Sequence, residues 1–555
     1  MLRATESEKE IPLPSYNTLH LDSLSAGKEI TNTLLFLQKK GYWEAQIERI
    51  FWVSDTMKVF IEAKKMYRWA HLDVSQIPMT ALSMMGYREK DFRGAPIDWE
   101  GLQLLEERLL EYAENRGYPF ANVFVDSILI KEEGLVARLR FEPNDRIVFD
   151  SIAIAGNNKI KARFLSKYLQ IISDAPFNQS LIDRSSLLLN RLPYLRVQAV
   201  PKVFFQLGRA YTTLYIGERK ASQIDGILGI LPNQERPDEV LFTGEFNLHL
   251  QNILGVGIGL TVEWQRIQSE SQRLLIGYKQ PQLFGTKVAL EGYFSLLRQD
   301  STFLTLDRGI VLSYRLSAFQ ELGLSFSARS SNNSLLLNNI QQQRETPIVS
   351  DQELWVYGLR YEYNRLNDFW YATKGYRLQL MAELGDKSTP RNPFLADSLW
   401  VGISEKSLQF GAKLNGEYFI PMGKKNTWLW RMQWAYVDNN NILFMNDLYR
   451  LGGLMQLRGH NQNEFYANFY GLLSSEYRIF LEAESYFFLF FDYSYYQMNV
   501  LRRASYEDTP FGLGLGISLS TEGGIFNFVY ALGQSAQNSL DFSRSKIHFG
   551  FIGRF

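Results

Sequence analysis

Strict two-residue alternation of side-chain character runs from about residue 219 to the end of the chain. It is clearest in GVGIGLTVEW (255–264), TWLWRMQWAY (427–436) and GLGLGISLS (512–520), where large apolar residues alternate with small or polar ones. Each segment is ~9 to 11 residues long, which is the length that a tilted membrane-spanning strand needs. No segment approaches the ~18 consecutive apolar residues of a transmembrane helix. The pattern therefore predicts β-strands with one apolar face and excludes a helical membrane protein.

Alternation alone fits both a soluble β-sandwich and a membrane barrel, because each has one apolar face per strand. The aromatic content of 14% favours the barrel, since Trp and Tyr gather near the strand ends, as in the aromatic belts of membrane proteins. Long polar segments such as 330–346 fit extracellular loops. Residues 219–555 suffice for roughly 16 antiparallel strands at about 21 residues per strand and loop.

The first part of the chain contains a repeat. Tyr42, Tyr118 and Tyr194 recur at an interval of 76 residues, each after a segment with helical apolar spacing. The unit reads strand, helix, helix, strand, strand, and KEEG (131–134) is the expected hairpin turn of the second copy. We predict a tail at 1–14, units at 15–72, 73–146 and 147–218, and a barrel at 219–555. The alternative is a set of ordinary α+β domains whose spacing is accidental.

The composition excludes several function classes. Lys plus Arg and Asp plus Glu number 59 each, which gives no support for a nucleic-acid partner. The chain has no Cys, its five His residues are far apart, and it contains no GxSxG, Walker or HExxH motif. We therefore predict no catalysis, no metal and no cofactor. The polar start, MLRATESEKE, lacks the apolar run of a signal peptide, and we expect that such a peptide has been trimmed.

Four motifs near the end of the chain carry a family resemblance. LRGH (457–460) precedes GLLSSEYRIF (471–480) and FFDYSYY (490–496), and the chain ends in HFGFIGRF (548–555). Together with the repeats and the predicted barrel, they resemble the outer-membrane assembly superfamily of BamA and TamA, whose periplasmic units are called POTRA domains. The sequence departs from the family pattern at His460, where an aromatic residue is usual, at Ser494, where glycine is usual, and at Gly553, where a hydrophobic residue is usual.

This resemblance implies a latch in the sixth extracellular loop. The loop motif consists of Leu457, Arg458, Gly459 and His460. It would fold back into a wet lumen and place Arg458 between Glu476 and Asp492 on strands 12 and 13. A guanidinium group forms forked, charge-assisted bonds with carboxylates, which lysine cannot duplicate. The alternative is a solvated loop arginine with no fixed partner.

The resemblance also assigns roles to the last strand. His548, Gly550 and Phe555 match its outer-membrane insertion signal. The last strand would meet the first strand, near 224–230, at a lateral seam, which cysteines near Leu228 and Ile552 would bridge. Gly550 and Gly553 would weaken the pairing of this strand with the first strand and let a client strand enter, or they only relieve crowding in the barrel wall.

The predicted function is non-enzymatic assembly, insertion or translocation of proteins at the bacterial outer membrane, with the N-terminal units in the periplasm. The expected partners are the lipid bilayer, unfolded client polypeptides and accessory lipoproteins or periplasmic proteins. The alternatives are a two-partner secretion exporter and a passive channel. Three repeats and no obvious plug helix before Ser15 argue against the exporter, and a passive pore needs neither the repeats nor the LRG motif. A fused lipid-modifying enzyme is conceivable in this superfamily, but no nucleophile motif supports one.

Overall fold

The structure is a computed structural model that describes residues 2–6, 9–19, 22–54, 56–232, 240–266, 271–299, 303–333, 349–391, 400–501 and 504–555. The chain forms two compact units. One comprises Met1–Ser151, Ile172–Asp183 and Val203–Thr212, and the other comprises Ile152–Ile171, Arg184–Lys202 and Thr213–Phe555. Among the described residues, no helix is both long and apolar enough to cross a membrane.

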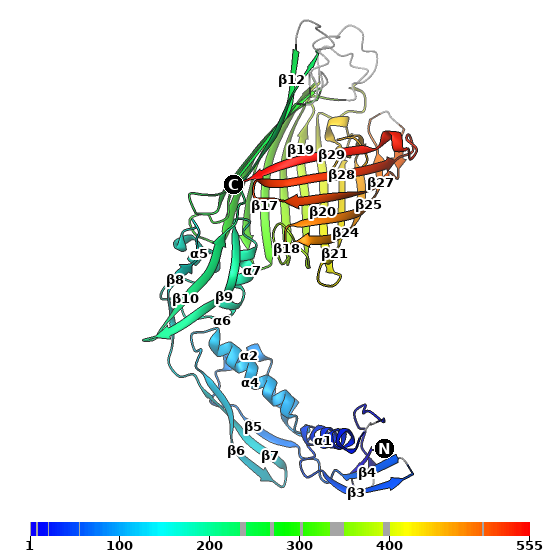
Figure 1. The fold of residues 1–555 in the computed structure, drawn as a ribbon. Helices are drawn as coiled ribbons and strands as arrows, with labels where there is room; N and C mark the ends of the chain where they lie inside the picture. Colours follow the sequence, from blue (N-terminus) through cyan, green and yellow to red (C-terminus); the bar gives the residue numbers. More distant parts are fainter. Residues whose placement is uncertain are drawn as a thin grey trace. The chain divides into compact units, whose positions relative to one another are not determined.

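Two small α/β layers make up most of the first unit. The first sheet has the strand order β2-β1-β4-β3 and the second has the order β5-β7-β6 (Figure 1). The elements are β1 (Leu2–Glu6), β2 (Lys9–Glu10), α1 (Ser23–Lys39), β3 (Gln46–Val53), β4 (Thr56–Glu62), β5 (Trp69–Asp73), α2 (Met79–Met85), α3 (Glu89–Phe92), α4 (Trp99–Glu114), β6 (Asn122–Lys131) and β7 (Gly134–Glu142). Helix α4 buries Leu102, Leu105 and Leu109 against Leu135 and Leu139 of β7, as its 3.6-residue apolar spacing requires.

The observed elements differ from the predicted unit boundaries at two places. Residues 2–6, predicted to be part of a tail, form β1, which pairs parallel with β4. Residues 69–73 form β5, which pairs parallel with β7 of the second sheet, because Trp69 and Leu72 pack into the second core. The first layer contains one described helix, α1, where the repeat predicts two. The predicted KEEG turn is present between β6 and β7.

A third α/β segment follows. Its sheet has the order β8-β10-β9, from β8 (Val148–Ala155), β9 (Leu195–Gln206) and β10 (Arg209–Glu218), with helices α5 (Ala162–Leu169), α6 (Gln179–Asp183) and α7 (Ser185–Asn190). The N-terminal part of the chain therefore consists of POTRA-like α/β segments, as predicted.

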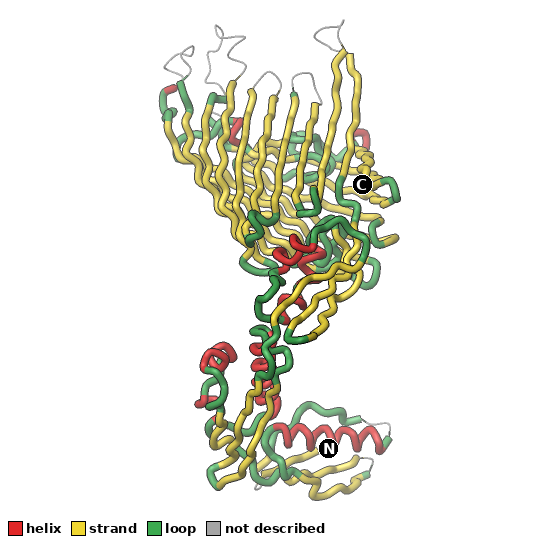
Figure 2. The backbone as a smooth tube through the Cα atoms, turned by 90° about the vertical axis from the view of Figure 1, so that its left-hand side faces the viewer, coloured by secondary structure: helices red, strands yellow, loops and turns green. Residues whose placement is uncertain are grey.

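The rest of the chain forms a closed antiparallel barrel, whose strands run side by side in Figure 2. The strands are β11 (Gln223–Pro232), β12 (Val240–Ile253), β13 (Ile258–Arg266), β14 (Gln272–Gln280), β15 (Val288–Gln299), β16 (Phe303–Arg315), β17 (Gln320–Asn333), β18 (Gln352–Asn364), β19 (Gly375–Ser388), β20 (Lys406–Pro421), β21 (Asn426–Asn439), β24 (Phe469–Glu482), β25 (Ser485–Met498), β26 (Tyr506–Asp508), β27 (Phe511–Ser520), β28 (Gly524–Gln534) and β29 (Lys546–Arg554). Both β26 and β27 pair with β25, and Pro510, which has no N–H, lies in the break between them. β26 and β27 therefore count as one strand of the barrel wall. With this count, the predicted 16 strands are confirmed.

The barrel wall is polar on its lumenal face. Glu291 forms ion pairs with Lys279 at 2.6 Å and Arg360 at 3.1 Å, and Glu417 pairs with Arg377 at 2.7 Å. The alternate positions carry exposed apolar side chains such as Phe410. This alternation gives the wall an apolar exterior and a charge-paired, wet interior.

One end of the barrel contacts the third α/β segment. The Lys161 N–H donates to the Gly255 carbonyl oxygen at 2.9 Å, and Trp370 Nε1 donates to the Pro193 carbonyl oxygen at 3.1 Å. These bonds reach the β12–β13 and β18–β19 turns. We call this end, where the turns between strands are short, the proximal end.

Candidate functional site

The chain between β21 and β24 folds into the barrel. It contains a 3-10 turn at Met445–Asp447 and a two-stranded sheet of β22 (Tyr449–Leu451) and β23 (Phe465–Ala467). Four of its residues, Leu451, Leu457, Phe465 and Ala467, are buried in one cluster with wall residues of β21, β24 and β25. The loop is therefore packed against the inner wall, as the family resemblance implies.

Arg458 at the loop tip is 5% exposed and donates to three wall side chains. Its Nε lies 2.7 Å from Asp492 Oδ2, and its Nη2 lies 2.7 Å from Asp492 Oδ1, so the aspartate is held by a two-pronged fork. Its Nη1 lies 2.6 Å from Glu476 Oε2, and Nη2 also donates to Ser474 Oγ at 3.0 Å. The guanidinium carbon lies 3.7 Å from the centre of the Phe490 ring.

Strand alternation explains how these partners converge. Ser474, Glu476 and Arg478 occupy every second position of β24 and are all buried on its lumenal face. The register pairs Ser474 with Asp492 and Glu476 with Phe490 of β25. Arg478 Nε donates to Glu476 Oε1 at 2.7 Å. Two guanidinium groups and two carboxylates thus balance in charge, as buried ions require.

The backbone of Arg458 and Gly459 fits a notch in the neighbouring part of the wall, formed by β27 and β28. Gly459 has a φ of 91°, and a Cβ there would lie 2.6 Å from the carbonyl carbon of Leu532 on β28. A Cβ at Gly533 would lie 2.5 Å from the Gly459 carbonyl oxygen, and one at Gly512 of β27 would clash with the Arg458 carbonyl oxygen. The register pairs Gly512 with Gly533, so two facing glycines form the notch.

His460 occupies the position where the family usually has an aromatic residue. Its ring makes an edge contact with Phe465, with 5.0 Å between ring centres. Its Nε2 also lies 3.1 Å from the carbonyl oxygen of Phe511, which no phenyl group could contact in this way. The histidine therefore supplies both an aromatic surface and a polar contact beside the notch.

The structure brings together the six residues of the predicted latch: Leu457, Arg458, Gly459, His460, Glu476 and Asp492. Four partners of these residues were not predicted: Ser474, Phe490, Gly512 and Gly533. The first two lie two residues from Glu476 and Asp492, so strand alternation was an available signal. The two glycines depend on the register of β27 with β28, which sequence does not specify.

The last strand pairs with the first over a very short length. β29 and β11 share two register pairs, Gln223 with Arg554 and Ile224 with Gly553, and the Phe555 N–H donates to the Ser222 carbonyl oxygen at 3.0 Å. Between β28 and β29, by contrast, pairing runs over eight residue pairs. In Figure 1, β29 extends from the point marked C, and its direction makes a wide angle with that of β12. The seam is therefore paired only at the proximal end.

This register corrects the predicted cysteine pair. Continuing it would place Asp225, not Leu228, opposite Ile552, and Ile552 pairs on its other side with Ile525. The backbone of Leu228 lies in β11, but its side chain is outside the described residues. His548 and Gly550 face Val529 and Asn527 of β28, and the Phe555 side chain is exposed.

Two arginines at the proximal end of the seam meet at one carboxylate. Arg219, just before β11, donates from Nη2 to Glu484 Oε1 at 3.0 Å, and Arg554 Nη1 lies 3.6 Å from Glu484 Oε2. Both guanidinium carbons lie 5.6 Å from the centre of the Tyr371 ring. Arg219 also pairs with Asp368 at 3.0 Å. We call Glu484, Arg219 and Arg554 the clasp. It was not predicted from the sequence, because its members lie far apart in the chain.

A second contact holds the loop on another part of the wall. Asp447 forms a fully buried ion pair with Lys387 of β19. The neighbouring Asn446 donates from Nδ2 to Ser331 Oγ of β17 at 2.9 Å and to the Ser350 carbonyl oxygen at 3.0 Å. The loop is thus attached to β17 and β19 as well as to β24 and β25. Over the described ranges, no group of three or more His, Asp or Glu side chains is placed to hold a metal ion.

Two solved structures have the same fold as this chain. CdiB from Acinetobacter baumannii is 11% identical over 97% of this chain and 100% of that chain, with a TM-score of 0.56. CdiB from Escherichia coli is 13% identical over 98% and 100%, with a TM-score of 0.55. BamA from Haemophilus ducreyi lacking POTRA domains 1-3 is 16% identical over 88% and 100%, with a TM-score of 0.44.

The family is established by sequence. A comparison with curated protein sequences found no match. A family model, the Omp85 superfamily domain, matches residues 252–555, which is more than half of the chain. With its closed 16-strand barrel and POTRA-like segments, the chain belongs to the Omp85 superfamily and is an outer-membrane β-barrel.

Proposed function

We propose that the protein is a non-enzymatic factor that inserts client polypeptides into the outer membrane, with its N-terminal α/β segments in the periplasm. The observation that carries this proposal is the short seam. β11 and β29 share only two register pairs. All the remaining pairs of adjacent wall strands, with β26 and β27 counted as one, share at least eight. Unpaired backbone groups cannot stay unsatisfied in lipid, so this edge is suited to accept a strand from another chain.

Edge strands of the N-terminal sheets support a role in guiding clients. In β3, an edge strand of the first sheet, every residue is exposed, including Ile50, Phe51 and Trp52. The edge strand β6 exposes Leu129 and Ile130. Unpaired strand edges with apolar side chains bind extended polypeptides with little dependence on sequence. A client in β-conformation would therefore be held by these edges before it reaches the seam.

A two-partner secretion exporter is the second candidate. The charge-paired lumenal wall favours it, because a wet, self-neutralised channel would not trap a passing polypeptide at one charged site. In that case, the loop anchored by Arg458 would have to leave the lumen during export. The insertion factor needs only the seam to open.

A disulfide across the seam tests the proposal. The register continued from Ile224 and Gly553 brings Gly229 opposite His548, so Gly229→Cys with His548→Cys should crosslink when the seam closes. We expect the oxidised protein to stop inserting barrel clients into liposomes and to recover when reductant is added. The chain contains no native Cys that could compete.

The matched control is Ile525→Cys with Ile552→Cys, a facing pair between β28 and β29 that are already paired. This crosslink should leave insertion unchanged. Full insertion activity in a completely crosslinked seam variant would overturn lateral entry and favour the exporter.

A further inference from the structure

A hollow of about 660 Å³ lies on the outer face of the barrel over β18 to β21 and β24. Glu417 points into the lumen toward Arg377 and Arg431, so its neighbour Gly416 faces outward. In the register, Gly416 of β20 lies opposite Leu378 of β19 on one side and Met432 of β21 on the other. The nearest atom to a Cβ built on Gly416 is the Met432 Cβ at 4.0 Å, so the missing side chain leaves this row of the wall open.

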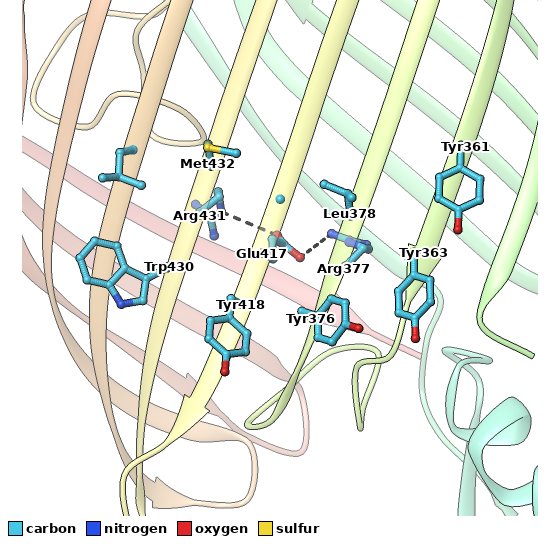
Figure 3. A pocket seen from close by; sticks show the side chains of 12 residues that line it. Tyr361, Tyr363, Tyr376, Arg377, Leu378, Glu417, Tyr418, Trp430, Arg431 and Met432 are labelled. Atoms are coloured by element: carbon cyan, nitrogen blue, oxygen red, sulfur yellow. Dashed lines mark hydrogen bonds and ion pairs between the residues drawn. The ribbon is translucent and has the colours of Figure 1, made fainter.

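The lining of the hollow is mainly apolar and aromatic, and its three charged residues, Arg377, Glu417 and Arg431, form ion pairs with one another. It includes Tyr363, Tyr376, Tyr418 and Trp430, and Figure 3 shows the hydroxyls of Tyr363 and Tyr418 pointing toward the turns at the proximal end. Tyr and Trp side chains whose polar ends point toward water are typical of the level at which a bilayer meets water. The hollow therefore opens into the hydrocarbon layer just beyond that level.

Positive charge is concentrated in the two turns directly below the hollow. Arg365 and Lys374 flank the β18–β19 turn, Lys424 and Lys425 form part of the β20–β21 turn, and all four side chains are exposed. None of them forms an ion pair with a residue that the structure describes. The one acid within these two turns, Asp368, already pairs with Arg219, and Glu482 at the end of β24 lies beside Lys424 and Lys425. The other proximal turns of the barrel contain one lysine, Lys287, together with Glu484 and Glu522.

We propose that this face binds an anionic phospholipid of the proximal membrane leaflet, with an acyl chain in the hollow over Gly416 and the phosphate on the cations of the two turns. Gly416 and Pro421 are five residues apart on one strand, or about 17 Å at ~3.4 Å per residue. A strand tilt of about 45° reduces this to about 12 Å along the membrane normal, within the ~15 Å of one hydrocarbon leaflet. The inference rests on the proposed placement of the N-terminal segments in the periplasm, which makes this leaflet the periplasmic one.

The test is lipid retention by the full chain. The protein is placed in nanodiscs that contain equal amounts of phosphatidylglycerol and phosphatidylethanolamine, and native mass spectrometry counts the lipids that it keeps on release. We expect phosphatidylglycerol to be enriched. Lys424→Gln with Lys425→Gln should reduce that enrichment by roughly fivefold for each charge removed. Gly416→Leu should fill the hollow and reduce retention of both lipids.

Two control variants lie elsewhere on the same wall. Gly292 faces outward between Tyr278 and Ile310 with equal space around it, and Lys287 lies in the turn next to that strand. Gly292→Leu and Lys287→Gln should leave retention unchanged. Equal retention of the two lipids by the unmutated protein, or an equal loss in the control variants, would overturn the proposal. The readout uses no client protein, so a failure of the insertion function would leave it intact.

Discussion

Among single residues, Arg458 joins the loop to the wall with five hydrogen bonds. Its guanidinium group is buried and satisfied by Asp492, Glu476 and Ser474 together. Burial of such ions is unfavourable unless every partner is present, so removing one partner from a buried ion pair costs about 3–5 kcal/mol. This energy is small beside the kinetic stability of a membrane barrel, and it is large enough to release a loop.

We therefore expect Arg458→Ala to leave a folded barrel with a released loop and impaired insertion, and Asp492→Asn to resemble it. Arg458→Lys should fall between them and the unmutated protein, because an ammonium group cannot make the fork. Limited proteolysis within 440–468 and heat-modifiable gel mobility measure loop release and barrel folding separately. Arg450→Ala is the control, since this arginine of the same loop lies over the rings of Phe303 and Tyr466 and forms no ion pair with a described residue. A protease-resistant loop with full activity in both latch variants would contradict a role for the latch.

The latch could be predicted from sequence only in part. Arg458, Glu476 and Asp492 lie within one stretch of the chain and carry motifs, so their meeting could be expected from the resemblance. Gly512 and Gly533 could not be assigned, because a glycine in a strand has many roles and its neighbours depend on the register.

At the scale of elements, the seam is closed by side chains at its proximal end. Arg219 and Arg554 share Glu484 and the Tyr371 ring, while backbone pairing contributes two register pairs. The clasp therefore adds side-chain contacts to the two backbone register pairs between β11 and β29. Without these contacts, β29 would be held mainly by its pairing with β28.

We expect Glu484→Gln to loosen the end of β29. The amide keeps the shape of the side chain and loses the charge that both guanidinium groups share, so backbone amides of 546–555 should exchange with deuterium faster. Hydrogen exchange with mass spectrometry on the folded barrel measures this effect. Glu482→Gln, in the exposed end of β24, is the matched control and should show unchanged exchange. Equal protection of β29 in both variants would contradict a structural role for the clasp.

The barrel strands could be predicted from the sequence, whereas the boundaries of the N-terminal units could not. Alternation with aromatic ends identified the barrel, because each strand must present one face to lipid. The strand count was right although β26 and β27 are separate segments, since together they fill one position. The boundaries at 14 and 72 differ from the observed elements because β1 and β5 join their sheets by parallel pairing, with partners far along the chain.

At the scale of the whole molecule, one loop is fastened to two separate parts of the wall. Arg458 holds it to β24 and β25, and Asp447 holds it to Lys387 of β19. Either contact alone keeps part of the loop in place. We therefore expect the two contacts together to keep the whole loop in the lumen.

We expect Arg458→Ala combined with Lys387→Met to raise the conductance of the barrel in planar bilayers by more than the sum of the two single variants. Coupling of this kind is typical of groups that restrain one element. The control combination is Arg458→Ala with Lys279→Met, because Lys279 pairs with Glu291 within the wall. It should conduct like Arg458→Ala alone. Strictly additive conductances would show that the two contacts act independently.

The glycine notch also has a consequence for the order of events during assembly. Its walls, Gly512 and Gly533, belong to strands that follow the loop in the chain, and Asp492 lies 34 residues after Arg458. Contacts between distant segments form late, because the chain between them must first be brought together. The loop tip fits its notch only when β27 and β28 are paired, so a seated loop reports that the wall has formed as far as β28.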